Sequence, residues 1–142
     1  MFFSIVNLKK RIDMENLVVG MGEALWDILP EGKKIGGAPA NFAYHVSQFG
    51  LPSCVVSAVG ADTFGKELLE NFTSKGLNHL IPEVPYPTGT VQVEIDPAGI
   101  PQYEIKENVA WDNIPYTPQL HTLAQKLSLI HISEPTRPEP IS

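Results

Sequence analysis

The residues with the clearest chemical potential lie in a glycine-rich segment, residues 36–41, which reads Gly-Gly-Ala-Pro-Ala-Asn. Paired glycines allow a ligand to approach the backbone, and the first turn of a helix presents N–H groups that lack helical partners. Asn41 adds one donor and one acceptor group to this turn, and buried ligand hydroxyls need such mixed pairing. A tight strand-to-helix turn, with Asn41 capping locally, explains the same residues equally well.

Asp27 is the second candidate, because it is a carboxylate in the otherwise apolar segment 24–29. A buried carboxylate needs a partner or a cleft open to solvent. Asp27 follows the carboxyl end of a predicted strand, where open α/β sheets bind their ligands. An edge or loop aspartate that simply contacts water is an equally good interpretation.

Other motifs favour structure over chemistry. Residues 60–65, Gly-Ala-Asp-Thr-Phe-Gly, could be a second ligand loop, but a turn with Asp62 or Thr63 as a helix N-cap explains them better. The Gly-x-Gly at 20–22 lacks the third glycine of a dinucleotide fingerprint, since position 25 is Leu25. There is no P-loop motif. The four histidines show no metal-ligand spacing, so no metal site is predicted.

Composition excludes several classes of protein. The chain has 142 residues, 43% of them apolar and 18% charged, and a net charge of −6. No basic stripe is available for nucleic acid, and no apolar run approaches the roughly 18 residues that span a bilayer. The order of charges near the start is the reverse of a signal peptide's. The single Cys54 lies in an apolar run and is interpreted as a buried structural thiol, which together with these features predicts a cytoplasmic protein.

The elements that would position these residues alternate between strands and helices. The apolar run 17–20 predicts a buried strand, 21–30 continue it irregularly, and 31–34 form a polar loop. A helix opens at Pro39, another buried strand covers 53–59, and a second helix of period 3.6 ends at Gly76. In the first helix, Phe42, Val46 and Phe49 define the apolar face. This order predicts an α/β fold with a parallel sheet.

The pattern changes in the last third of the chain. Apolar and polar residues alternate over 91–95 and again over 103–105, and a strong turn at 96–99 joins them into a predicted hairpin with one wet face. Thr117 and Pro118 begin a last helix. Residues 133–140 contain three prolines and can form neither a helix nor an inner strand.

Together these segments resemble the ribokinase-like (pfkB) family of carbohydrate kinases. The family's amino-terminal signature is a glycine pair, a small residue or proline, an asparagine and a small residue, followed by two spaced glycines. Residues 36–43 match it, and Gly50 and Gly60 keep its spacing. The resemblance also covers 22–27 and 60–65 and extends to about residue 126. It is strongest to the fructokinase branch, because ribokinases usually carry lysine where this chain has Ala38.

The resemblance implies a sandwich with a parallel central sheet and a β-hairpin lid at about 86–107. It further implies transfer of phosphate from ATP, with Mg²⁺, to a hydroxyl of a small sugar, most similar to fructose. The positions of Asp27, Gly36, Gly37 and Asn41 match the family's substrate-binding residues. The lid would exclude water and could form a homodimer, and Trp111, just beyond it, could pack near the sugar.

The resemblance does not extend to the family's second signature, which carries the catalytic aspartate and much of the ATP site. Nothing in 107–142 matches it, so we expect no catalytic and no cofactor-binding residue in this chain. We therefore expect 14–126 to be the amino-terminal half of a kinase domain, truncated before its carboxyl-terminal half and inactive by itself. Residues 1–13 are interpreted as a leader and 127–142 as a non-native or disordered tail. A ketodeoxygluconate, ribose or nucleoside kinase, or a non-catalytic sugar-binding module, are the alternatives.

Overall fold

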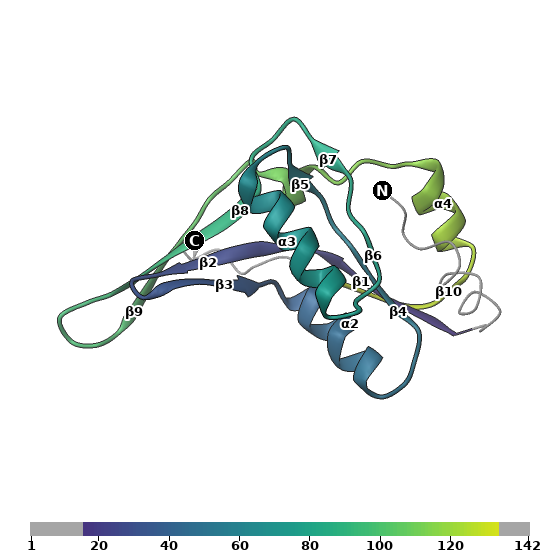
Figure 1. Ribbon diagram of the computed structural model, residues 1–142, viewed down its shortest axis with the longest axis horizontal. Helices are drawn as coiled ribbons and strands as arrows, with labels where there is room; N and C mark the ends of the chain where they lie inside the picture. Colours follow the sequence, from purple (N-terminus) through teal and green to yellow (C-terminus); the bar gives the residue numbers. More distant parts are fainter. Residues whose placement is uncertain (1–15, 134–142) are drawn as a thin grey trace, which may run out of the picture.

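A parallel four-stranded sheet forms the centre of the computed structural model, which describes residues 16–133 (Figure 1). The predicted leader and the end of the predicted tail lie outside these residues. The strand order is β10-β1-β4-β6, and all three neighbouring pairs are parallel. The strands are β1 (Leu17–Gly22), β4 (Ser53–Val56), β6 (His79–Leu80) and β10 (Leu127–Ser133).

Helices cover both faces of this sheet. Helices α2 (Ala38–Gln48) and α3 (Thr63–Ser74) pack on one face, where the core contains Val55, Leu68 and Phe72. The short helix α4 (Pro118–Ala124) covers Val19 and Cys54 on the other face. The predicted α/β class is therefore confirmed, and apolar strands buried on both faces are the expected companions of parallel pairing.

A second sheet of order β3-β2-β8-β9 extends away from the first (Figure 1). Its strands are β2 (Leu25–Leu29), β3 (Gly32–Gly36), β8 (Gly89–Ile95) and β9 (Pro101–Ile105). The prediction of an irregular segment and a polar loop at 21–34 is wrong, because β2 and β3 form an antiparallel hairpin. Lys33 and Lys34 look like loop residues, but lysines are also typical of a sheet edge, which β3 occupies.

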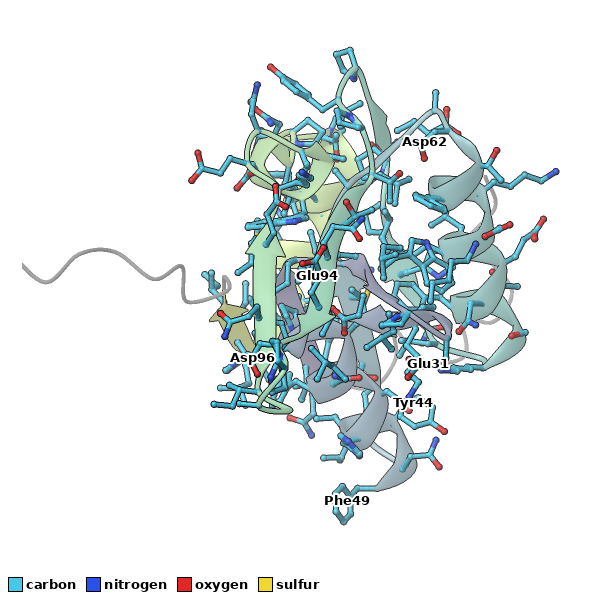
Figure 2. All side chains as sticks on the ribbon, turned by 90° about the vertical axis from the view of Figure 1, so that its left-hand side faces the viewer. Glu31, Tyr44, Phe49, Asp62, Glu94 and Asp96 are labelled. Carbon is cyan, nitrogen blue, oxygen red and sulfur yellow. The ribbon has the colours of Figure 1, made fainter. Side chains whose placement is uncertain are left out.

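The buried face of α2 also differs from the prediction. Its buried residues are Pro39, Ala40 and Ala43, whereas the side chain of Phe49 is 85% exposed and lies at the far end of the helix (Figure 2). The cause is the close approach of α2 to β1. A Cβ atom on Gly20 would lie 2.2 Å from the carbonyl oxygen of Pro39, so only small side chains fit between the two elements.

The strand predicted at 53–59 is divided between two sheets. It ends at Val56, and Val59 and Gly60 form β5, which pairs with β7 (Glu83–Val84). Helix α3 then begins as predicted, because the Asp62 side chain accepts a hydrogen bond from the N–H of Gly65. Gly76 follows the end of this helix with a φ of 67°, a conformation that favours glycine.

The predicted hairpin and last helix are confirmed. Strands β8 and β9 pair antiparallel, and the Asp96 side chain closes their turn by accepting from the N–H groups of Ala98 and Ile100. A 3₁₀ helix, η1 (Ala110–Asn113), follows the hairpin. Thr117 caps α4 by accepting from the N–H of Leu120.

The start of the predicted tail is a strand. Residues 127–133 form β10, which pairs along the full length of β1. We predicted this segment to be non-native or disordered because its pattern departs from the family's. The backbone of this segment nevertheless pairs with β1 and satisfies the hydrogen-bonding groups on that side of it, which would otherwise form an open sheet edge.

A matched pair of phenylalanine substitutions tests this core. Phe72, at 2% exposure, packs between α3 and the sheet, so Phe72→Ala should lower the free energy of unfolding by about 3–5 kcal/mol. Phe49→Ala removes the same atoms from an exposed side chain and should change it by less than about 0.5 kcal/mol. Urea unfolding measures both. Equal losses would contradict the observed orientation of α2.

Candidate substrate-binding site

Asp27 lies in the middle of β2, at the centre of the second sheet. It pairs with Lys34 on one side and with Val91 on the other. Its carboxylate forms no hydrogen bond or ion pair with any residue in the described range 16–133, including Lys34 opposite it. A half-buried carboxylate of this kind has acceptor capacity left for a ligand.

Gly36 leaves room for that carboxylate. The two residues lie on the same face of the β2–β3 hairpin, and a Cβ atom on Gly36 would lie 2.6 Å from Oδ2 of Asp27. No side chain could therefore occupy position 36 without displacing the carboxylate. The structure thus brings together two of the residues predicted from the sequence.

Gly37 joins this hairpin to α2 with a φ of 119°, which favours glycine. A Cβ atom there would also lie 2.4 Å from the carbonyl oxygen of Glu23. The sequence predicts that a ligand approaches the backbone at this glycine pair, and this remains a prediction for Gly37. The group that lies against Gly37 in the structure is the protein's own backbone, at the junction of β1 and β2.

Glu23 is the residue whose role sequence reasoning missed. It is 4% exposed, and its Oε1 accepts a hydrogen bond from the N–H of Ala38 at 3.0 Å. A carboxylate at a helix N-terminus satisfies an otherwise unpaired N–H group and complements the helix dipole. The N–H of Ala38 at the start of α2 is therefore not unpaired, contrary to the expectation from the sequence, because Glu23 accepts from it. An acidic residue between Gly22 and Ala24, in an apolar stretch, was the available signal.

Asn41 lies in the first turn of α2, and its side chain is exposed. Its backbone N–H donates to the carbonyl oxygen of Gly37 at 3.2 Å. Within the described residues the side chain makes no hydrogen bond, to Asp27 or to any other group, so its predicted local capping role is not formed. The Asn41 amide therefore retains both its donor and its acceptor.

Burial shapes the electrostatics of Asp27. Desolvation raises the pKa of its carboxyl group above the ordinary value of 3.8, with no compensating partner. A carboxylate whose charged form is not stabilised by the protein is typical of a functional site.

On the face of the β2–β3 hairpin opposite Asp27, a brace, meaning the contacts among Trp26, Lys33, Phe64 and Glu67, holds β2 against α3. The indole N–H of Trp26 donates to the carbonyl oxygen of Phe64 at 2.9 Å. The Lys33 ammonium lies 4.9 Å from the Trp26 ring centroid and 4.8 Å from that of Phe64, and it pairs with Glu67. Because Trp26 precedes Asp27 in the strand, this brace fixes the backbone that carries the carboxylate.

The β8–β9 hairpin continues the face on which Asp27 lies. Leu25, Val91 and Val93 form a buried cluster there, with Leu29 and Ile105 at its border. The ring of Trp111 covers the start of β8, because a Cβ atom on Gly89 would lie 2.5 Å from its Cδ1. Asp27 is thus a polar group within an apolar surface, an arrangement that is common in small-molecule sites.

The remaining candidates behave as structural residues. Cys54 is 1% exposed, and burial raises the pKa of its thiol to about 12, which confirms the structural interpretation. His45 is exposed on α2. Between residues 16 and 133 no group of three or more metal-ligating side chains could hold an ion, and no helix is long and apolar enough to cross a membrane.

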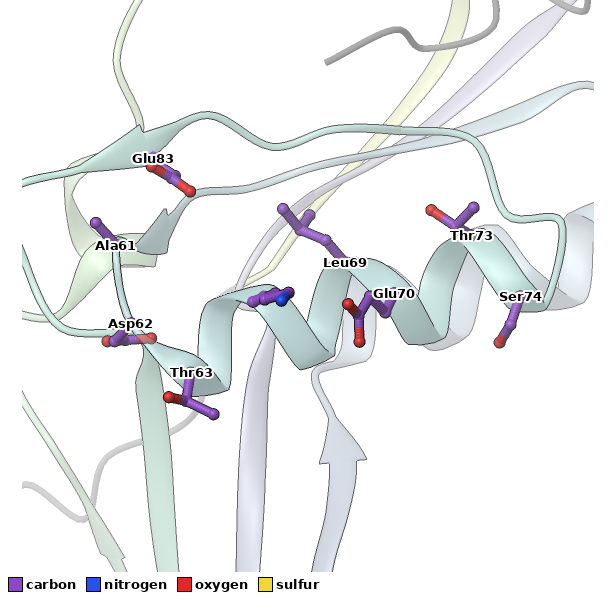
Figure 3. A pocket seen from close by; sticks show the side chains of 9 residues that line it. Ala61, Asp62, Thr63, Leu69, Glu70, Thr73, Ser74 and Glu83 are labelled. Carbon is purple, nitrogen blue, oxygen red and sulfur yellow. The ribbon is translucent and has the colours of Figure 1, made fainter.

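A wide, open depression of about 800 Å³ runs along α3 (Figure 3). Its lining includes Asp62, Lys66, Glu70 and Glu83, charged residues of both signs on a solvated helix surface. None of Asp27, Gly36, Gly37 and Asn41 borders it. We place the candidate site at Asp27, because a half-buried carboxylate with no partner among the described residues indicates ligand binding better than an open surface depression does.

This chain belongs to the pfkB family of carbohydrate kinases. The family's sequence model, described as pfkB family carbohydrate kinase, matches residues 31–137, which is more than half of the chain. The match includes the glycine pair, Asn41, α3 and the β8–β9 hairpin. The fold agrees with this assignment.

Individual relatives support the same family. An uncharacterized sugar kinase of Pyrococcus horikoshii is 34% identical over 116 residues, 70% of this chain and 37% of that protein. A fructokinase of Salmonella typhimurium is 35% identical over 86 residues, 56% of this chain and 28% of that protein. The crystal structure of a Xylella fastidiosa fructokinase with bound ATP superimposes with a TM-score of 0.70 at 25% identity, covering 84% of this chain and 39% of that one. The chain thus spans well under half the length of these relatives.

The two aspartates of this region should respond to pH with opposite signs. The pKa of Asp27 is raised in the folded chain, so its charge opposes folding at pH values above that pKa. The stability of Asp27→Asn relative to the unsubstituted chain should therefore increase as pH rises from 3.8 through the folded pKa of Asp27. Urea unfolding at several pH values between 3 and 7 measures this difference.

Asp62 provides the contrast. Burial raises its pKa, but hydrogen bonds from Thr88 and Gly65 outweigh that effect and hold the pKa below 3.8. Asp62 therefore stabilises the fold above pH 3.8 and loses this contribution as pH falls through its folded pKa. As pH rises through the folded pKa of Asp62 to 3.8 and above, the free energy of unfolding of Asp62→Asn should fall relative to that of the unsubstituted chain. Two parallel profiles would contradict the assigned environments.

Proposed function

We propose that this chain forms the sugar-binding side and the lid of an ATP-dependent carbohydrate kinase, with fructose as the sugar. The observation that carries the proposal is the Asp27 carboxylate, which is half-buried against Gly36 with its acceptor capacity unused by the described residues. Sugar hydroxyl groups are donors that such a carboxylate accepts, and charged hydrogen bonds are about twice as strong as neutral ones.

Asn41 and Gly37 complete the proposed pocket from the start of α2. The exposed amide of Asn41 can both donate to and accept from a hydroxyl group. Gly37 packs against the carbonyl oxygen of Glu23 and lets the chain turn from β3 into α2, which places Asn41 in the first turn of the helix. The choice of fructose is supported by the fructokinases among the relatives, whose identity to this chain is 35% in the Salmonella protein.

The β8–β9 hairpin is the proposed lid. It extends from the face that carries Asp27, and its apolar residues Val91 and Val93 lie on that same face. A lid of this kind excludes water, which would otherwise compete with the sugar for the transferred phosphate.

The resemblance implies that the catalytic aspartate and much of the ATP site belong to a second signature, which nothing in 107–142 matches. No side-chain cluster between residues 16 and 133 fits Mg²⁺, so we derive no step through the metal. ATP supplies the phosphate in the proposed reaction, as the kinase family implies. We expect the 142-residue chain by itself to bind sugar without turning over ATP, and a coupled assay for ADP release tests this.

Calorimetry with D-fructose tests the binding half of the proposal. Asp27→Asn removes one charged acceptor and should weaken fructose binding about 10- to 100-fold, since a hydrogen bond to a charged group contributes about 1.5–3 kcal/mol. Gly36→Ala should weaken it comparably, by displacing the carboxylate. Adding Gly36→Ala to Asp27→Asn should cause little further loss if Gly36 acts through Asp27.

Glu70→Gln is the matched control. It removes one exposed carboxylate from α3, in the depression along that helix, and should leave the affinity for fructose unchanged. Loss of binding in Glu70→Gln but not in Asp27→Asn would move the site to α3. Preferential binding of ribose, ketodeoxygluconate or a nucleoside would replace fructose as the substrate.

A second copy of the chain is the proposed protein partner of the hairpin. Ile95, Ile100 and Tyr103 are 59%, 56% and 63% exposed on the two strands of the hairpin and their turn. Hairpin-to-hairpin association would cover them. Sedimentation equilibrium should then show a dimer whose dissociation constant rises at least about tenfold in Tyr103→Lys. A monomer at all concentrations would contradict this association.

A further inference from the structure

The entry to the β8–β9 hairpin is held by a group of hydrogen bonds that the proposed site does not use. Thr88 directly precedes β8 and is 4% exposed. Its backbone N–H donates to Asp62 Oδ2 at 2.9 Å, and its hydroxyl donates to Asp62 Oδ1 at 2.6 Å. Its Oγ1 in turn accepts from the N–H of Gly60 at 2.9 Å. Both the donor and the acceptor capacity of this hydroxyl are therefore used.

The two glycines of the segment 60–65 occupy positions where a side chain would collide with the residues at the start of the β8–β9 hairpin. A Cβ atom on Gly60 would lie 2.4 Å from the carbonyl oxygen of Tyr86 and 2.9 Å from the backbone nitrogen of Thr88. A Cβ atom on Gly65 would lie 2.9 Å from Oγ1 of Thr88. A helix N-cap alone requires neither contact, so the capping role leaves this part of the motif unexplained.

The segment that follows β9 returns to the start of β8. The N–H of Ala110 donates to the carbonyl oxygen of Pro87 at 2.7 Å, and Trp111 covers Gly89. Both ends of the hairpin therefore converge at Thr88, which is tied to the core through Asp62. From there β8 pairs with β2 in the register Gly89–Leu25 to Gln92–Ile28, and this register places Val91 beside Asp27.

We propose that Asp62 is a positioning residue for the hairpin, acting through Thr88 to fix where β8 begins beside Asp27. A strand that slips by one residue turns its side chains to the other face, so an anchor at the first residue decides which side chains face Asp27. The consequence for sugar binding rests on the proposed function. The anchor itself is independent of it.

Two substitutions separate the anchor from the helix cap. Asp62→Asn keeps an N-cap acceptor for Gly65, because asparagine caps helices as well as aspartate does. The asparagine side chain has only one oxygen, however, so it cannot accept from both the N–H and the hydroxyl of Thr88 as the two carboxylate oxygens do. Thr88→Val leaves Asp62 intact and removes only the hydroxyl. Thr88→Ser retains the hydroxyl, and Thr117→Val removes a threonine cap from α4, far from the hairpin in the chain.

Amide hydrogen exchange of the full chain is the measurement. In Asp62→Asn and Thr88→Val, exchange over residues 89–95 and 101–106 should be at least about tenfold faster than in the unsubstituted chain, while β1 and β4 change little. Thr88→Ser and Thr117→Val should leave the hairpin unchanged. Faster exchange confined to the first turn of α3 would reduce Asp62 to a cap and overturn the proposal. The proposal would also be overturned if exchange accelerated equally in β1 and the hairpin, or if the hairpin exchanged as fast in Thr88→Ser as in Thr88→Val.

Fructose calorimetry on the same variants separates the two proposals. If the unsubstituted chain binds fructose, Thr88→Val should bind it about tenfold more weakly and Thr88→Ser should not. Unchanged affinity in Thr88→Val would overturn the positioning role while the proposed function stands. If the unsubstituted chain binds no fructose, the proposed function fails, and the exchange data alone decide whether Asp62 anchors the hairpin.

Discussion

The close packing of the start of α2 against the strands before it is the constraint on which the site depends. At Gly20, Gly36 and Gly37 a Cβ atom would lie between 2.2 and 2.6 Å from a neighbouring oxygen. Two of these oxygens are backbone carbonyls and the third belongs to the Asp27 carboxylate. The contacts at Gly20 and Gly37 set the start of α2 against β1 and the junction before β2, and the contact at Gly36, within the β2–β3 hairpin, leaves room for the carboxylate at the centre of the proposed sugar site.

Three carboxylates of the amino-terminal half illustrate how environment assigns different roles to one chemical group. Glu23 is buried and bound to the first turn of α2, and Asp62 is held by the N–H groups of Gly65 and Thr88. Both stabilise the fold through bonds to the protein. Asp27 has no such bond among the described residues, and its burial raises its pKa. A charge that lowers the stability of the fold is the pattern expected where a residue serves binding at the expense of stability.

Local patterns predicted those parts of the fold that local forces determine. The turn at 96–99 and the alternation around it predicted the hairpin, and the cap at Asp62 marked the start of α3. The errors arose where tertiary packing overrides pattern. Lys33 and Lys34 are compatible with a loop or with an edge strand, and only the pairing of β3 with β2 distinguishes them. Phe49 fits the helical period, but small residues are needed where α2 meets β1.

The sequence by itself determined the family and the candidate ligand groups, because the spacing of glycines, Asp27 and Asn41 is a one-dimensional pattern. Tertiary structure alone decided how those groups relate. It brought Asp27 over Gly36, gave the N–H of Ala38 to Glu23, and joined Asp62 to Thr88 across 26 positions of the chain. The partners lie 9 to 26 positions apart in the chain, and the sequence pattern does not state which side chains face each other, so only the folded backbone establishes their distance.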